Sequence, residues 1–314
     1  MAADGLAPLA PSLARRLVVY AGERFPPLEY APASAIFFLA AYLAALALVR
    51  RGPDVLAIVV GLVTVLLVFF HLRLMDEVKD AQHDALHYPE RPVPRGLMTL
   101  AEVRLLIAVC VAIELALNAA LSWTALGAYL IVAAFTLLMY REFFLGARLR
   151  ANFLVYTLVH MPSLPLLAIY AYVLAASPGH GIEVDPAFAP FLIATYAIGL
   201  ALEVARKVHS PNDEPAGVYT YTKQLGTVGA CALLIALVAI VTVCFLGLGA
   251  ALGWGPSFGV PVAALSAVAI AGLTSFALFP SRARARVVKK VFVPAAVLGP
   301  YLTVLAHAIA RTGG

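Results

Sequence analysis

The sequence predicts an all-α membrane protein in which nine transmembrane helices surround a central cavity capped by two cytoplasmic polar loops. Hydrophobic residues make up 63% of the 314 residues and charged residues only 12%, far from the balance of a soluble globular domain. Apolar runs of about 20 residues recur along the whole chain, and a helix of that length crosses the hydrocarbon core of a bilayer. Long polar stretches follow the second and the sixth of these runs.

The nine predicted spans follow one another closely. They are residues 33–50, 54–75, 98–121, 123–145, 151–176, 187–206, 225–248, 258–279 and 288–310. The remaining residues leave no room for a soluble domain, so we expect residues 1–314 to form a single transmembrane domain. Residues 1–32 are polar and proline-rich without a cleavable signal pattern, and their LARRLVVYAGERF part is expected to lie along the cytoplasmic membrane surface.

The basic residues predict the orientation in the membrane. With the loop after the second span in the cytoplasm, all 22 lysines and arginines except Arg50, Arg51 and Arg311 fall on the cytoplasmic side. The positive-inside rule therefore favours a cytoplasmic N-terminus and cytoplasmic polar loops. The net charge of +5 suits loops that face anionic lipid and a phosphate ligand, so no nucleic-acid partner is expected.

The first polar loop, residues 73–96, carries the sequence RLMDEVKDAQHDALHYPERPVPRG. Asp76, Asp80 and Asp84 are four residues apart, which places them on one face of a helix. Like charges at this spacing repel each other. A divalent cation relieves the repulsion, and Mg²⁺ prefers carboxylate and phosphate oxygens. The pattern therefore predicts a Mg²⁺ site at the membrane surface.

Basic residues in the same loop suggest that the ligand is a diphosphate. Lys79 lies between two of the aspartates, and the prolines of HYPERPVPRG form a stiff turn that fixes Arg91 and Arg95. The planar guanidinium group of arginine donates two hydrogen bonds to a phosphate at once.

The spacing DxxxDxxxD followed by PxRPxPRG resembles the first Asp-rich motif of the UbiA superfamily of intramembrane prenyltransferases. The nine spans and the polar loop after the sixth span extend the resemblance to residues 33–310. The resemblance implies that Asp76, Asp80 and Asp84 are catalytic residues that hold Mg²⁺ bound to an isoprenyl diphosphate. The family usually has Asn at the first of these positions, and the Asp in this chain keeps an oxygen ligand there.

The second polar loop, ARKVHSPNDEPAGVYTYTKQLG, departs further from the family pattern. Gly217, Thr220 and the pair 225–226 match it, and Asp213 matches its second acidic position as a catalytic metal ligand. His209 occupies the first acidic position, so Glu203 on the sixth span is an alternative metal ligand. The basic residues of this loop are expected to contact the diphosphate: Arg206, Lys207, His209 and Lys223.

Several polar residues fall inside the predicted spans. Glu114 is either a catalytic acid or the partner of a buried structural hydrogen bond, for example with Asn118. His160, beside two prolines, is either a core histidine in a kinked helix or a functional residue. The tyrosines of the spans are expected to pack or to lie at the interface, although some could stabilise a carbocation: Tyr140, Tyr156, Tyr170, Tyr172 and Tyr196.

Three functions fit this pattern. The favoured one is Mg²⁺-dependent ionisation of an isoprenyl diphosphate with transfer of the prenyl group to an acceptor of unknown type, because transferases are the larger part of the family. The second is terpene cyclisation without an acceptor. The third is a lipid transporter without enzymatic activity, which fits less well because the charge lies at one membrane face instead of the midplane.

Overall fold

The computed structural model describes residues 12–176, 184–215 and 219–312, and every regular element within them is helical. The predicted all-α class is therefore confirmed. Residues 1–11 and Gly217 of the expected second-loop motif lie outside the described residues. The elements are α1 (Leu13–Arg24), α2 (Pro27–Val49), α3 (Val55–Lys79), α4 (Ala81–His87), α5 (Leu100–Leu121), α6 (Trp123–Tyr140), η1 (Glu142–Phe144), α7 (Gly146–Ala151), α8 (Phe153–His160), α9 (Ser163–Ala176), η2 (Pro186–Phe188), α10 (Ala189–Arg206), η3 (Pro211–Asp213), α11 (Tyr221–Ala251), α12 (Pro256–Leu278), α13 (Arg282–Val287), η4 (Val288–Phe292) and α14 (Val293–Thr312).

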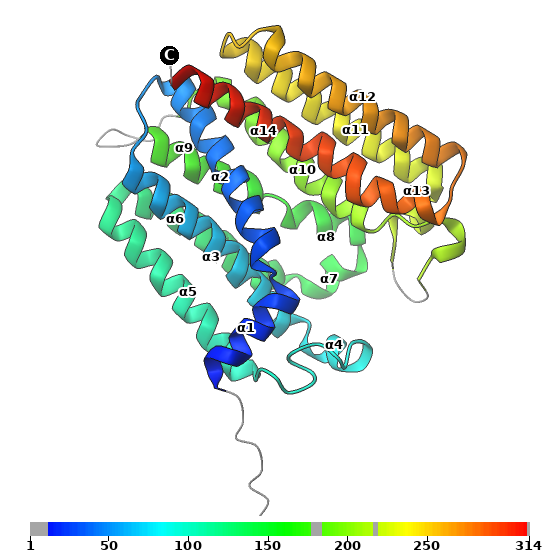
Figure 1. Cartoon of the computed structure of the whole chain (residues 1–314). Coiled ribbons are helices and arrows are strands. Elements are labelled where there is room, and N and C mark those ends of the chain that lie inside the picture. The colour runs from blue at the N-terminus through cyan, green and yellow to red at the C-terminus, as the bar shows by residue number, and fades with distance from the viewer. Residues whose placement is uncertain (1–11, 177–183, 216–218, 313–314) are drawn as a thin grey trace, which may run out of the picture.

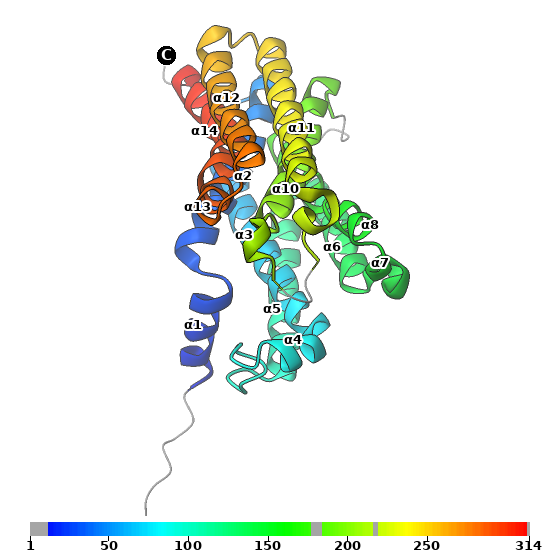
Figure 2. The same cartoon turned by 90° about the vertical axis from the view of Figure 1, so that its right-hand side faces the viewer.

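The long helices pack in chain order into a closed ring. Each helix contacts the next in the series α2, α3, α5, α6, α9, α10, α11, α12 and α14. Helix α14 packs back against α2 and closes the ring. Figure 1 shows these helices side by side, and Figure 2 shows α12 and α14 on one flank of the bundle with α7 and α8 on the other. Helix α2 also packs against α9 across the ring.

Eight helical segments in the described part of the chain are long and apolar enough to cross a membrane. Together with the buried core they make the protein an integral, multi-pass membrane protein. The predicted span 98–121 forms α5, which carries Glu102, Arg104 and Glu114 and is not among the eight. The number nine therefore stays a prediction.

Small side chains allow α2 and α9 to approach closely. Ala41 and Ala45 on α2 and Ala168 and Ala171 on α9 are fully buried in the same core cluster. In a membrane, where apolar side chains gain little from leaving lipid, such close packing supplies much of the helix association.

A break divides the predicted span 151–176 into α8 and α9. Helix α8 ends at His160 and α9 begins at Ser163, with a turn at Met161 and Pro162 between them. Proline lacks the backbone N–H that would continue the hydrogen-bond ladder, so the helix is interrupted there. The break places His160 at a helix end instead of inside a continuous span.

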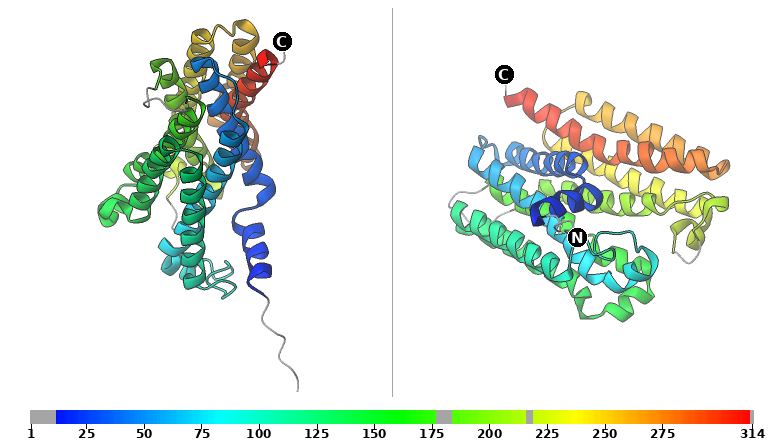
Figure 3. Two further views of the ribbon diagram at one scale, coloured as in Figure 1. Left: turned by 90° about the vertical axis from the view of Figure 1, so that its left-hand side faces the viewer. Right: turned by 60° about the horizontal axis from the view of Figure 1, so that its bottom comes forward.

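The N-terminal helix α1 is attached to the same end of the bundle as α4, as the blue and cyan segments in the left view of Figure 3 show. Arg24 Nε lies 2.6 Å from Glu77 Oε1 on α3, and Arg16 Nη2 lies 2.5 Å from Glu102 Oε1 on α5. Tyr20 packs into a small buried cluster with Leu74. The predicted surface segment is therefore bound to the bundle by ion pairs and packing.

Candidate active site

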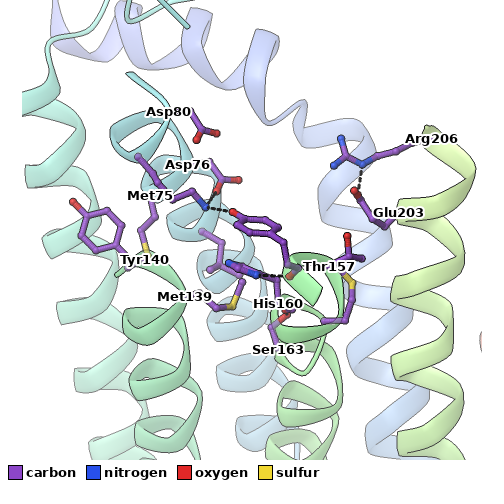
Figure 4. Close-up of a pocket in the computed structure, with 14 residues that line it drawn as sticks. Met75, Asp76, Asp80, Met139, Tyr140, Thr157, His160, Ser163, Glu203 and Arg206 are labelled. Carbon is purple, nitrogen blue, oxygen red and sulfur yellow. Dashed lines mark hydrogen bonds and ion pairs between the residues drawn. The ribbon is translucent and has the colours of Figure 1, made fainter. Parts of the chain in front are cut away.

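A cavity of about 320 Å³ opens at this end of the bundle, between α3, α6, α8, α9 and α10. Asp76 and Asp80 enter it from the end of α3, and Glu203 and Arg206 enter from the end of α10 (Figure 4). His160 lies deeper in the bundle than these charged groups (Figure 4). The full lining is Leu72, Met75, Asp76, Lys79, Asp80, Met139, Tyr140, Tyr156, Thr157, His160, Met161, Ser163, Glu203 and Arg206.

Lys79 connects α3 to α8 across the cavity. Its Nζ lies 3.1 Å from Asp76 Oδ1 and donates a hydrogen bond of 3.1 Å to the hydroxyl of Tyr156 on α8. The same ammonium group lies 5.8 Å from the centre of the Tyr156 ring. Lys79 is thus held by a carboxylate and a phenol, both of which line the cavity.

Asp80, the residue that caps the end of α3, lines the cavity. Partial burial by the surrounding protein raises the pKa of its carboxyl, and the negative charges of Asp76 and Asp84 add to this effect. Lys79 lowers it, but the net shift is upward. A carboxylate in this position gains from a nearby cation, because a cation stabilises the charged form.

Asp84 does not line the cavity in this structure. Its side chain is buried, and its Oδ1 accepts a hydrogen bond of 2.6 Å from Arg91 Nη1. The Arg91 guanidinium also lies 3.7 Å from the centre of the Tyr88 ring. Arg95 pairs with Glu23 of α1, with 2.7 Å between Nη2 and Oε1. Both predicted diphosphate-binding arginines of the turn are thus engaged with protein carboxylates.

On the opposite wall, Glu203 is bound by two basic neighbours. Arg206 Nε contacts Glu203 Oε2, and Lys207 Nζ lies 2.9 Å from Glu203 Oε1. Burial lowers the pKa of Lys207, although the Glu203 carboxylate opposes the shift. Of these three residues, Glu203 and Arg206 line the cavity.

The rest of the second polar loop lies elsewhere. Asp213 and His209 line a separate pocket of about 340 Å³ together with basic residues of α13 and η4. Asp213 accepts a hydrogen bond of 3.0 Å from Ser210 Oγ, and its Oδ1 lies 3.6 Å from Arg282 Nε. Burial, followed by the charge of Lys289, lowers the pKa of His209. Lys223 donates to the carbonyl of Pro215.

Glu114 is buried among hydrogen-bonding partners instead of lining the cavity. Its Oε1 lies 2.9 Å from His71 Nδ1, and its Oε2 accepts a hydrogen bond of 2.5 Å from Tyr129. The expected neighbour Asn118 bonds to the Glu114 carbonyl, and Tyr170 donates to the Asn118 side chain. This arrangement matches the structural alternative for Glu114, and the catalytic role stays a prediction.

A second, apolar groove of about 690 Å³ runs between α5 and α6 and shares Met75 and Tyr140 with the charged cavity. Arg104 and Thr136 are its polar lining residues, and the rest of the lining is mainly aliphatic. A charged chamber therefore adjoins an apolar one, which suits a molecule with a charged head and a hydrocarbon tail.

The profile of the UbiA prenyltransferase family matches residues 35–298. The chain belongs to the UbiA prenyltransferase family. Membership supports an enzyme that acts on isoprenyl diphosphates at the level of the family. No curated protein sequence matches the chain significantly.

Solved structures support the UbiA fold over nearly the whole chain. A digeranylgeranylglyceryl phosphate synthase shares 16% identity with a TM-score of 0.67, covering 94% of this chain and 99% of that chain. A UbiA homologue from Aeropyrum pernix shares 18% identity with a TM-score of 0.66, covering 90% and 98%. A UbiA homologue from Archaeoglobus fulgidus bound to DMAPP and Mg²⁺ shares 18% identity with a TM-score of 0.54, covering 90% and 96%. At these identities the likeness concerns the fold.

Sequence reasoning on this UbiA-family protein did not single out two residues that the structure makes prominent. His71, the partner of Glu114, sits inside an apolar run with no motif around it. Thr157 lines the cavity beside Tyr156. A polar residue inside a predicted span was the one available signal for both.

Proposed function

We propose that this UbiA-family protein ionises an isoprenyl diphosphate in a Mg²⁺-dependent reaction and transfers the prenyl group to an acceptor. One observation carries the proposal: Asp76, Lys79 and Asp80 at the end of α3 share a cavity with Glu203 and Arg206 of α10 at one end of an apolar bundle. Membership in the UbiA family supports the same conclusion.

The residues present fit a magnesium ion. Asp76 and Asp80 offer hard carboxylate oxygens, and burial together with the charges of Asp76 and Asp84 raises the pKa of Asp80, an effect that a bound cation would oppose. Within the described residues no three His, Cys, Asp or Glu side chains gather into a site by themselves, so oxygens of the diphosphate would complete the coordination. Mg²⁺ bound there would neutralise the diphosphate and improve it as a leaving group. The A. fulgidus homologue is itself bound to Mg²⁺ with DMAPP.

Lys79 and Arg206 are the cations that we assign to the diphosphate, because both line the cavity. Lys79 would exchange its 3.1 Å contact with Asp76 for a phosphate oxygen, leaving that carboxylate for the metal. Arg206 is largely exposed at the rim, where its guanidinium can turn from Glu203 toward an entering anion. Arg91, Arg95, Lys207, His209 and Lys223 stay predictions that require the loops to move on binding.

The apolar groove between α5 and α6 is the assigned place of the isoprenoid tail. It begins at Met75 and Tyr140, where the charged cavity ends. Burying each CH₂ of a tail there is worth about 0.8 kcal/mol relative to water. The tyrosine rings beside the junction can stabilise an allylic cation by their negative faces. We further propose that this end of the bundle faces the cytoplasm, on the charge distribution given above.

The test is turnover of GPP by the full-length protein in lipid nanodiscs with Mg²⁺. Asp80→Ala removes a metal ligand and is expected to lower turnover at least ~10²-fold, the scale of one strong transition-state contact. Glu90→Gln alters an exposed acid of the same loop and is the matched control, expected to keep wild-type turnover. Normal turnover in folded Asp80→Ala would contradict the site.

The fate of the cation is tested by the products. Mass analysis of the same reaction, with and without added phenols and lipid alcohols, is expected to give prenylated acceptors. A cyclic hydrocarbon formed at the same rate without any acceptor would replace transfer by cyclisation. No Mg²⁺-dependent consumption of GPP, DMAPP or longer isoprenyl diphosphates would leave the transporter alternative.

A further inference from the structure

His160 is a buried histidine in the wall of the cavity. Its Nδ1 lies 2.7 Å from the backbone carbonyl of Tyr156. A carbonyl oxygen accepts hydrogen bonds and donates none, so Nδ1 carries a proton, and in the neutral ring Nε2 carries a free lone pair. The side chain is only 7% exposed, and Nε2 is buried without a hydrogen-bond partner in the described part of the chain.

Packing fixes the direction of this lone pair. The Tyr156 ring stacks on the imidazole with 4.0 Å between centroids and 20° between planes. Phe143 of η1 meets the imidazole edge-on, with 5.6 Å between the ring centroids. A buried polar atom without a partner is uncommon and calls for an explanation, of which a catalytic role is one.

Charged groups surround His160 without pairing with it. Lys79 and Asp76 face it from α3 and Glu142 from η1, and Glu203 and Arg206 line the same cavity from α10. The carboxylates of Asp76 and Glu203 are each held by lysine or arginine. His160 differs from them because it is an imidazole and lies deeper in the bundle (Figure 4).

We propose that His160 Nε2 is the general base that removes the proton from the prenyl acceptor, an inference that rests on the proposed transferase function. The allylic C–O bond breaks, and its electron pair leaves with the diphosphate oxygen. The acceptor, a hydroxyl group or an electron-rich aromatic carbon, forms the new bond to the allylic carbon. Its proton passes to Nε2, and the resulting imidazolium keeps its Nδ1–H bond to Tyr156 until product leaves.

The acceptor class follows from the same geometry. The base sits among aromatic rings and the hydroxyls of Thr157 and Ser163, below the carboxylates. A neutral nucleophile that carries a removable proton suits such a place. An anionic nucleophile would need no base and would be repelled by the carboxylates above.

Two variants separate the base from the packing. His160→Asn places an amide N–H near the position of Nδ1, where it can still donate to the Tyr156 carbonyl, but it has no basic nitrogen. His160→Ala removes the ring and leaves space that added imidazole can fill. Asp80→Asn is the comparison for loss of ionisation.

The test uses the full chain in nanodiscs with Mg²⁺ and GPP that carries ¹⁸O in the bridging position, with a phenol and a lipid alcohol supplied as acceptors. Scrambling of ¹⁸O reports ionisation, and total organic product reports completion. We expect His160→Asn to keep scrambling at the wild-type rate or above while product formation falls ~10²-fold or more, the range of general-base catalysis. The fall of kcat at low pH, where a base is protonated, should disappear in this variant, and imidazole should restore His160→Ala.

Unchanged product formation in His160→Asn, or loss of scrambling and product together, would overturn the role of base. Failure of imidazole to restore His160→Ala would do the same. If the wild-type protein neither scrambles nor consumes GPP, DMAPP or a longer isoprenyl diphosphate, the proposed function itself fails. This outcome is distinguishable from failure of the base assignment, because it is seen in the wild-type protein before any substitution is made.

Discussion

Removing Glu114 should destabilise the bundle instead of stopping the chemistry. The Glu114 carboxylate contacts His71 at 2.9 Å and Tyr129 at 2.5 Å, and the three side chains are fully buried. They join α3, α5 and α6, whose mutual packing builds one side of the ring. The network therefore holds in place the helix that carries the candidate metal ligands.

The expected cost can be bracketed. Leaving a buried polar group without its partner costs about 1–3 kcal/mol in soluble proteins. Hydrogen bonds between membrane helices average about 0.6 kcal/mol and reach about 1.7, because the unfolded state in lipid also finds partners. For Glu114→Ala, which strands two groups and leaves a void, we expect about 2–4 kcal/mol. Glu114→Gln keeps the volume and one acceptor, so we expect about 0.5–1.5 kcal/mol.

The assay is reversible unfolding in mixed micelles, with turnover of GPP measured on the folded fraction. A double-mutant cycle with Tyr129→Phe should give a coupling energy of about 0.5 kcal/mol or more, as expected for side chains in contact. The reasoning fails if Glu114→Gln is as stable as the wild type while its turnover falls ~10²-fold, the loss typical of a catalytic group.

Three further outcomes are expected. Gly61→Ala should destabilise the folded protein by about 1–3 kcal/mol, because the new methyl group would collide with Phe38. Gly127→Ala adds a methyl group in open space on a helix and should be neutral or stabilising by up to about 1 kcal/mol. Thermal unfolding in detergent measures both variants, and equal effects would contradict the packing. The hydrogen bond from Arg95 lowers the pKa of Glu23, so the stabilisation of α1 by this ion pair is fully present above the ordinary glutamate pKa and is lost as the pH falls through the lowered pKa of Glu23. Proteolysis of α1 should therefore accelerate on acidification, and Arg95→Gln should make proteolysis fast at every pH. Tyr156→Phe should raise KM for GPP only a few-fold, since Lys79 keeps its ion pair, and a loss of ~10³-fold in kcat would show a direct role of the hydroxyl in the reaction.

Part of the motif of the first polar loop lines the cavity, and part of it does not. Asp76 and Asp80 do line the cavity, but Asp84 turns to Arg91. The helical spacing behind the prediction holds only while the helix continues. Helix α3 ends at Lys79 and α4 begins at Ala81, so the face shared by the three aspartates is broken at Asp80.

The positions of the second-loop residues were harder to predict, because helix α10 ends at Arg206 and most of the loop lies beyond it. Glu203, the alternative acid, is in the cavity, whereas Asp213 and His209 line a basic pocket beside α13. Helix α10 fixes the position of Glu203 through regular geometry. The residues after it follow a path set by contacts with α13 and η4, segments roughly 80 residues later that no local pattern relates to them.

The sequence by itself determined the all-helical membrane class, the family resemblance and the end of the bundle at which charge collects. These follow from composition and from spacing within single helices, and lipid makes both decisive because a spanning segment must satisfy its own backbone. Only the tertiary structure decided that Glu114 pairs with His71 and Tyr129, and that His160 lines the cavity with its Nε2 buried and without a hydrogen-bond partner among the described residues. Such contacts join helices that are far apart in the chain, and their partners are set by how the ring closes.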